Sequence, residues 1–233
     1  GHNRIIITKC KTVEEAFFYV LETIKNNWSR IVLTHQIESG LFKRQGKAVS
    51  NFNETLPQPD SDLAKEIIKD PYNFDFLTFS NDLNEKDLER NLIDNITKFL
   101  IELGAGFAYM GRQVPIKVGD REFFIDLLFY HTKLHRYIVI ELKTVDFEPE
   151  HAGKLNFYIK SVDMLIRREG DNPTIGILLC KNKDRLVAEY SLSDIGKPIG
   201  VSEYQLTQTL PDELRSSLPS ITEIRKQLGR KES

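Results

Sequence analysis

Two apolar segments, each carrying a single carboxylate, constrain the fold of this chain more than any other feature. Asp126 lies within Phe-Phe-Ile-Asp-Leu-Leu at residues 123–128, and Glu141 lies within Ile-Glu-Leu-Lys at residues 140–143. Runs so rich in apolar residues are typical of strands that are buried in a sheet. A carboxylate in such a strand is unfavourable unless a partner or a metal ion compensates for its burial. The two segments therefore predict a sheet with a polar site built into it.

The spacing of these segments brings their charged side chains together. Residues 131–136 predict a hairpin, which can place Asp126 and Glu141 at the same end of adjacent strands. The strand period of two places Glu141 and Lys143 on one face. Asp126, Glu141 and the backbone carbonyl of Leu142 can then hold Mg²⁺, which prefers oxygen ligands, with Mn²⁺ as a substitute. Lys143 can position or deprotonate a water, or neutralise charge that develops on a phosphate.

The same residues also allow a second interpretation. Glu141 and Lys143 can form a buried ion pair at the end of a sheet, with Asp126 as a turn or cap residue. However, residues 141–143 are the only acidic-x-Lys triplet in a chain of which 28% is charged, which favours a catalytic role. Glu89 is a candidate third metal ligand because it borders the apolar face of a predicted helix. A solvated helical glutamate is the alternative for Glu89.

The remaining pattern predicts a mixed α/β (α+β) fold with the element order α-β-β-β-α-β. Helical periodicity begins at Asn81 or Asp82 and ends near Leu103, with Gly104 after it. The expected later elements are strands at 112–118, 121–130 and 137–144, a helix at 150–168, a strand at 174–180 and a short fifth strand at 186–190. Upstream, we expect a strand or extended entry at 4–9 and helices at 12–26 and 29–44.

Turn-forming residues between 45 and 62 predict a linker, so we expect three parts. These are a partial, mainly helical N-terminal domain with its linker at 1–75, a domain at 80–210 that contains the carboxylates, and a C-terminal tail helix at 211–233. The N-terminal part is interpreted either as a winged-helix-like DNA reader or as a protein-interaction surface.

Composition narrows the functional classes. The formal net charge of −2 means that nucleic-acid binding requires a local basic patch. Cys10 and Cys180 are the only cysteines and lack metal-ligand spacing, which favours a reducing, cytoplasmic compartment over a disulfide scaffold or a zinc site. No apolar run approaches the roughly 18 residues of a membrane span. We therefore expect no membrane partner.

The segments around Asp126 and Glu141, and many others along the chain, resemble the bacterial YhcG-like proteins, which pair a helical N-terminal domain with a C-terminal PD-(D/E)xK nuclease domain. The resemblance covers nearly all of the chain. Residues 1–3 resemble an internal segment of that family, so we expect the family's first helices to be missing here. The matching stretches include residues 28–30, 35–41, 87–89 with 92–93, 99–107, 111–113, 124–131, 139–143, 149–150, 152–153, 156, 158, 177–181 and 197–204.

The resemblance implies a restriction-endonuclease-like fold and a Mg²⁺-dependent nuclease that acts on DNA, with RNA as the less favoured substrate. It implies a metal site at Glu89, Asp126 and Glu141, with Lys143 as the catalytic lysine. The chain departs from the family pattern at Lys154, where Ala-Gly is often followed by Gln. Lys154 either contacts a phosphate or competes with the metal, which leaves an alternative function: a catalytically weak module that binds DNA or protein.

Candidate nucleic-acid contacts come from predicted loops and strand ends near the carboxylates. A basic loop between the two active-site strands can reach a phosphate backbone, although a solvated basic loop is the simpler alternative. A homodimer would let two sites address two strands. The candidates are Arg112, Gln113, Lys133, Arg136, Lys154 and Tyr158.

Overall fold

The structure is a computed structural model that describes residues 1–77 and 84–206. None of the helices in these ranges is long and apolar enough to cross a membrane. The helices are α1 (His2–Lys9), α2 (Val13–Asn26), α3 (Arg30–Glu38), α4 (Leu41–Arg44), α5 (Phe52–Thr55), α6 (Asp60–Ile67), α7 (Glu85–Asp94), α8 (Ile96–Leu103), α9 (Pro149–Leu165) and α10 (Arg185–Ser193). The strands are β1 (Val49–Ser50), β2 (Tyr72–Asn73), β3 (Phe107–Val118), β4 (Arg121–His131), β5 (Arg136–Leu142), β6 (Ile175–Cys180) and β7 (Ile199–Gln205).

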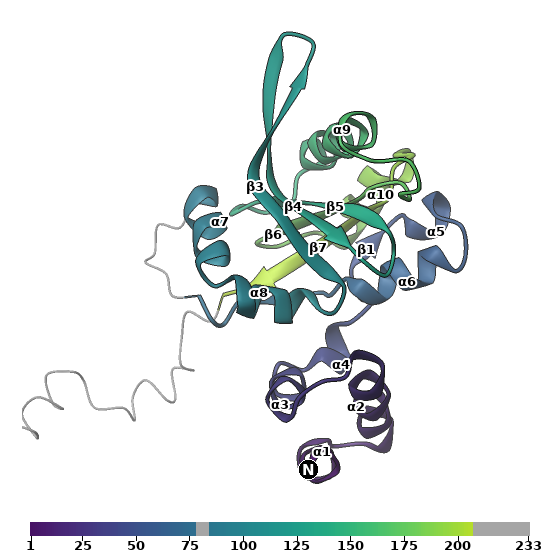
Figure 1. Ribbon diagram of the computed structural model, residues 1–233, viewed down its shortest axis with the longest axis vertical. Coiled ribbons are helices and arrows are strands. Elements are labelled where there is room, and N and C mark those ends of the chain that lie inside the picture. Colours follow the sequence, from purple (N-terminus) through teal and green to yellow (C-terminus); the bar gives the residue numbers. More distant parts are fainter. Residues whose placement is uncertain (78–83, 207–233) are drawn as a thin grey trace, which may run out of the picture.

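One sheet with the strand order β1-β7-β6-β5-β4-β3 organises the molecule, and β2 also pairs with β7. Strands β3, β4 and β5 are antiparallel neighbours, whereas β5, β6 and β7 run parallel. Helices cover both faces of the sheet (Figure 1). Helices α5 to α8 contribute to the hydrophobic core on one face, and α9 and α10 contribute to the core on the other. The expected mixed α/β fold with the order α-β-β-β-α-β is confirmed in α8-β3-β4-β5-α9-β6.

Strands β3 and β4 project beyond the rest of the sheet as a two-stranded arm (Figure 1). Strand β4 pairs with β5 only from Leu127 to His131, but it pairs with β3 all the way back to Arg121. The part of β4 before Leu127 therefore has β3 as its only strand partner among the described residues. Asp126 lies where the arm leaves the sheet.

Several expectations about individual elements were wrong, one through a packing contact and another through a helix cap. Residues 4–9 lie within helix α1, whose Ile6 is buried in a core with residues of α2 and α3. Residues 186–190 lie within helix α10, because the Asp184 carboxylate accepts hydrogen bonds from the first backbone N–H groups and caps the helix. The expected helix up to Leu103 is divided into α7 and α8 at Asn95. Its expected start at residues 81–82 lies outside the described residues.

The helix expected at 29–44 is also divided, since Gly40 has a left-handed backbone (φ 66°) between α3 and α4. Strand β7 was not anticipated from the sequence at all. Neither the break at Gly40 nor the pairing of β7 follows from the local sequence pattern.

The segment expected to be a linker belongs to the sheet instead. Strand β1 pairs with β7, and Phe52 is fully buried in the core formed by α5 to α8. Asn51 accepts a hydrogen bond from the backbone N–H of Ile199 (2.8 Å) and donates one to the carbonyl of Ile195 (2.8 Å). The N-terminal helices α1 to α4 have their own small core. The change from one core to the next therefore falls near residues 44–49, earlier than the expected boundary at 75–80. The expected tail helix at 211–233 lies outside the described residues.

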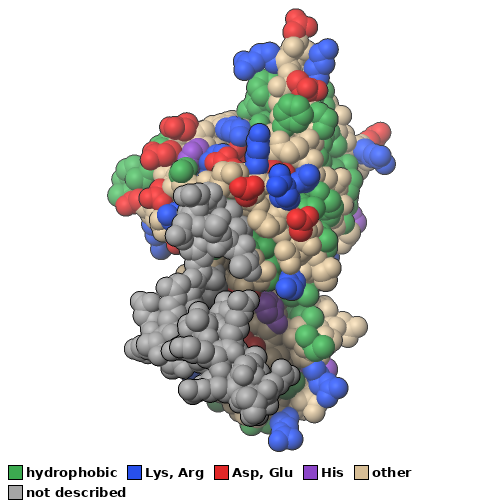
Figure 2. Space-filling view, turned by 90° about the vertical axis from the view of Figure 1, so that its left-hand side faces the viewer, with side chains coloured by type: hydrophobic (Ala, Val, Ile, Leu, Met, Phe, Trp, Pro, Cys, Tyr) green, Lys and Arg blue, Asp and Glu red, His purple; other side chains and the backbone are tan. Residues whose placement is uncertain are grey.

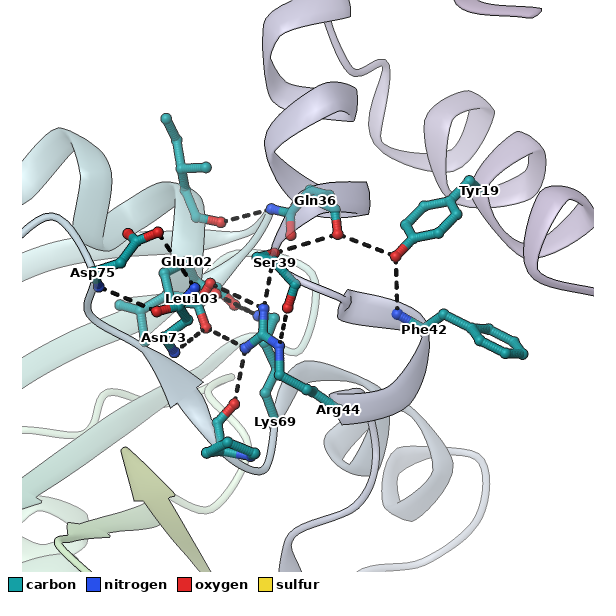
Figure 3. A network of polar contacts seen from close by, with 12 residues as sticks. Tyr19, Gln36, Ser39, Phe42, Arg44, Lys69, Asn73, Asp75, Glu102 and Leu103 are labelled. Carbon is teal, nitrogen blue, oxygen red and sulfur yellow. Dashed lines mark hydrogen bonds and ion pairs between the residues drawn. The ribbon is translucent and has the colours of Figure 1, made fainter. Parts of the chain in front are cut away.

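A buried polar network joins the N-terminal helices to the sheet domain (Figure 3). The Arg44 guanidinium of α4 contacts the carboxylate of Glu102 in α8 at 2.6 Å, and both side chains are buried. Lys69 donates to the carbonyl of Leu103 at 2.7 Å, and Gln36 donates to the carbonyl of Ile101 at 3.1 Å. These bonds satisfy carbonyls in the last turn of α8, which have no partner within the helix.

Candidate functional site

The antiparallel register of β4 and β5 brings two carboxylates together. Leu127 lies opposite Ile140, so Asp126 and Glu141 occupy the next level along the two strands. The Oδ2 atom of Asp126 accepts a hydrogen bond from the backbone N–H of Leu142 at 3.0 Å. Glu141 is fully buried although its side chain is acidic. The hairpin predicted from the sequence therefore does place both acids at one end of the strands.

Two lysines converge on one oxygen of Glu141. Lys143, which directly follows β5, places its Nζ 3.1 Å from Oε1 of Glu141 and 3.0 Å from Oε2 of Glu85. Lys154 of α9 places its Nζ 2.5 Å from the same Oε1 atom of Glu141. In contrast, Oε2 of Glu141 is buried and has no hydrogen-bond partner among residues 1–77 and 84–206. Both ammonium groups therefore contact Oε1 of this carboxylate, and within the described part of the chain neither contacts Oε2.

Helix α7 supplies a third acid, Glu89, and Gln113 of β3 lies between it and Asp126. Glu89 is only 4% exposed, and its Oε2 accepts a hydrogen bond from Nε2 of Gln113 at 2.5 Å. The same Nε2 lies 3.4 Å from Oδ1 of Asp126. A guanidinium nitrogen of Arg112 lies 3.8 Å from Oε1 of Glu89. The three acids therefore come from α7, β4 and β5, and the amide of Gln113 lies between the first two.

Burial and the charges of neighbouring residues shift the pKa values of the ionisable side chains at this site. Burial, then the negative charge of Glu141, raises the pKa of Asp126 to about 7. Burial likewise raises the pKa of Glu89, although Gln113 and Arg112 oppose it. Burial alone would lower the pKa of Lys143, but Glu141 and Glu85 outweigh it and the pKa is raised. A site with repelling acids is typical of a place where a cation binds.

The oxygen donors at this site are few, so a divalent cation bound here would keep several waters. Within residues 1–77 and 84–206, no three His, Cys, Asp or Glu side chains gather closely enough to form a complete ligand cluster. Mg²⁺ needs fewer protein ligands than that, because it keeps several waters. Asp126 and Glu141 supply adjacent carboxylates, and Oε2 of Glu141 is buried with no hydrogen bond from any described residue. These two residues fit a hard cation, whereas in this arrangement an oxygen of Glu89 is taken by Gln113.

The other expected nucleic-acid contacts divide into two groups. Arg112 and Lys154 lie beside the acids and are 46% and 43% exposed at their side chains. Tyr158 lies next to Lys154, whose Nζ is 5.4 Å from the centre of the tyrosine ring. Lys133 lies at the opposite end of β4 and β5 and donates to Asn26 of α2 at 3.3 Å.

The expectation for Arg136 was wrong. Its side chain is 1% exposed and its guanidinium pairs with Asp60. It also lies at the hairpin end of β5, about five residues or roughly 17 Å of strand from Glu141. Arg136 is therefore a structural residue that ties the hairpin to α6, and it cannot contact a phosphate.

Glu85 is a site residue that the sequence analysis missed. It begins helix α7 and accepts a hydrogen bond from the catalytic-lysine candidate Lys143. A usable signal was present, because Glu85 and Glu89 are four residues apart and share one face of a helix.

Two carboxylates on adjacent strands, with a lysine two residues after the second, define the class of PD-(D/E)xK nuclease domains. Residues 65–219 match the family model of the YhcG PDDEXK nuclease domain, and residues 1–44 match that of the DUF1016 N-terminal domain. The first match covers more than half of the chain, so the chain belongs to the YhcG PDDEXK nuclease-domain family.

Among curated proteins, the chain is similar to "Putative nuclease YhcG" of Escherichia coli (strain K12). The two are 31% identical over 208 residues, which make up 88% of this chain and 55% of the relative. The chain thus spans about half the length of the curated relative that it matches.

Among solved structures, similarity is more distant. A repair endonuclease from Pyrococcus abyssi gives a TM-score of 0.36 at 19% identity and covers 55% of this chain and 49% of that chain. An EndoMS–dsDNA complex gives a TM-score of 0.38 at 16% identity and covers 57% of this chain and 51% of that chain.

Proposed function

We propose that this domain hydrolyses phosphodiester bonds of DNA in a reaction that depends on Mg²⁺ or Mn²⁺. The observation that carries the proposal is the convergence of Asp126, Glu141 and Lys143, in which Oε2 of a fully buried Glu141 has no hydrogen-bond partner in the part of the chain that the structure describes. In the net reaction the oxygen of a water bonds to phosphorus, one P–O ester bond breaks, and the leaving oxygen takes up a proton.

The acids at the base of the arm are the proposed metal ligands. Asp126 and Glu141 would hold the metal directly, with the carbonyl of Leu142 and Oε1 of Glu89, which Arg112 approaches to 3.8 Å, as further ligands. When bound, such a metal lowers the pKa of its water and offsets negative charge at the phosphate. The raised pKa of Asp126 supports this assignment, because a cation at that position would relieve the repulsion from Glu141.

Lys143 is proposed to stabilise charge on the phosphate and not to act as the base. Its raised pKa keeps the ammonium charged at neutral pH, and a charged ammonium cannot accept a proton. Its Nζ is held between Glu85 and Glu141, which fixes its position at the site. Preorganised positive charge of this kind stabilises charge that develops in the transition state.

DNA is proposed to approach along the face that carries Arg112 and Lys154. Figure 2 shows basic and acidic side chains intermingled on the face viewed from the side of α7, with no uniformly basic surface. The phosphate contacts would therefore be few and local, and binding should weaken as salt is raised.

The test is cleavage of supercoiled and linear DNA with Mg²⁺ or Mn²⁺. We expect cutting by the unmodified chain and none by Glu141→Ala or Lys143→Ala, while the exposed-residue controls Glu169→Ala and Lys98→Ala cut normally. Supercoiled DNA separates endonuclease from exonuclease action, and RNA of the same sequence tests the substrate class. Cutting that survives Glu141→Ala would rule out this site.

A second candidate, a catalytically weak module that binds DNA, is favoured by one contact. The ammonium of Lys154 lies 2.5 Å from Oε1 of Glu141, where it competes with a metal for that carboxylate. If Lys154 suppresses catalysis, Lys154→Gln should bind Mg²⁺ more tightly in calorimetry and cleave faster. Unchanged affinity and rate in Lys154→Gln would remove the support for this candidate.

A further inference from the structure

The backbone of Gln113 has a conformation that is rare for its residue type. Gln113 lies within β3, between Arg112, which is opposite Leu127, and Val114, which is opposite Ile125. Its φ is +46°, in the left-handed region that non-glycine residues seldom adopt and that strands do not contain. Such an outlier persists only when its surroundings hold it in place, and outliers cluster at functional sites.

The neighbouring strand β4 changes the face on which its alternate side chains pack, and it does so opposite Gln113. Ile125 packs in the core beside α9, whereas Leu127 packs in the core on the opposite face. Residues two apart in a regular strand share one face, so β4 turns over at Asp126. The left-handed residue and this change lie directly opposite each other, at the point where the arm leaves the sheet.

This backbone directs the Gln113 amide between two acids from different elements. Nε2 lies 2.5 Å from Oε2 of Glu89 in α7 and 3.4 Å from Oδ1 of Asp126 in β4. An amide can donate to two carboxylates without adding positive charge. In contrast, a lysine or arginine there would neutralise one of the acids and oppose cation binding.

We infer that Gln113 is a positioning residue whose amide holds Glu89 beside Asp126, so that α7 can contribute the third acid of the metal site. This inference rests on the proposed metal-dependent function. It replaces the expectation from the sequence that Gln113 contacts nucleic acid. Residues that orient metal ligands commonly change metal affinity by about 10–100-fold when they are removed.

Comparing Gln113→Ala with Gln113→Gly separates the effect of losing the side-chain amide from the effect of the positive φ. Both variants lose the amide, but glycine adopts a positive φ without strain. We expect isothermal titration with Mn²⁺ to show about 10–100-fold weaker binding for both variants. We also expect Gln113→Gly to have a higher melting temperature than Gln113→Ala. The exposed glutamine Gln205 of β7 supplies the matched control Gln205→Ala, which should bind Mn²⁺ as the unmodified chain does.

Two further measurements separate this inference from its rivals. In EDTA, DNA affinity should be unchanged in Gln113→Gly, and a loss of DNA affinity with normal Mn²⁺ binding would make the amide a DNA contact and overturn the inference. If the unmodified chain binds no metal, the proposed function fails. Urea unfolding then decides whether Gln113 holds Glu89. Gln113→Ala should shift the urea midpoint in the unmodified chain more than in a Glu89→Ala background. Equal shifts in the two backgrounds would show that Gln113 does not hold Glu89.

Discussion

Replacing Asp126 by asparagine should stabilise the metal-free protein at high pH. The pKa of Asp126 is raised from 3.8 to about 7 by burial and by Glu141. The folded state therefore binds a proton more tightly than the unfolded state, and stability falls as pH rises from about 4 to about 7. The difference of about three pH units, at about 1.4 kcal/mol each, corresponds to about 4 kcal/mol above pH 7. The substituted asparagine carries no charge, so the penalty should disappear in the variant, while its side-chain oxygen can still accept the hydrogen bond from Leu142.

The assay is urea unfolding in EDTA at several pH values between about 4.5 and about 8.5, for the unmodified chain and for Asp126→Asn. The stability difference should be small near pH 4.5 and should grow to about 4 kcal/mol in favour of the variant at pH 8. Comparing the two proteins at each pH removes the contributions of other groups, such as His131, which titrate equally in both.

Divalent metal supplies the control for this prediction. Mg²⁺ at pH 8 should stabilise the unmodified chain, because binding of a ligand to the folded state adds to its stability. The gain should be much smaller in Asp126→Asn. A difference between the proteins that does not vary with pH, or a variant that is less stable at pH 8, would refute the reasoning about Asp126.

Two further predictions concern stability away from the site. Arg44→Ala should lower the free energy of unfolding by about 3–5 kcal/mol in urea titrations, because it leaves the fully buried Glu102 without its cation; a loss below about 1 kcal/mol would contradict this. Burial lowers the pKa of His131 to about 4 from 6.5, so the folded state binds fewer protons and stability is lost as pH falls from about 6.5 to about 4. This loss, about 3 kcal/mol, should be absent in His131→Gln, and unfolding curves at pH 4.5 and pH 7 would show whether it is.

The sequence alone determined the central acids and the lysine. Strand periodicity and a short hairpin place Asp126 and Glu141 at one level, and they place Lys143 on the face of Glu141. These are local relations, since they depend only on spacing within adjacent strands. The α-β-β-β-α-β order was predictable for the same reason, because the strands and the long helix have strong periodicity.

Only the tertiary structure decided which other polar residues contact the central acids. Arg136 was expected from the sequence to be an accessible loop residue, but pairing with Asp60 buries it. Glu85, Gln113 and Lys154 reach the acids from α7, β3 and α9, whose relative positions no local pattern specifies.

Tertiary structure also decided that strands within residues 45–75 join the sheet. The turn-forming residues at 45–62 predicted a linker, but β1 in that segment and β2 shortly after it both pair with β7, more than a hundred residues later in the chain. Backbone hydrogen bonds between strands carry no signature in the side-chain pattern of such short segments, whereas the face of a long strand is specified by its period. Spacing within the chain therefore determined the placement of the two central acids and the lysine, and long-range packing determined what surrounds them.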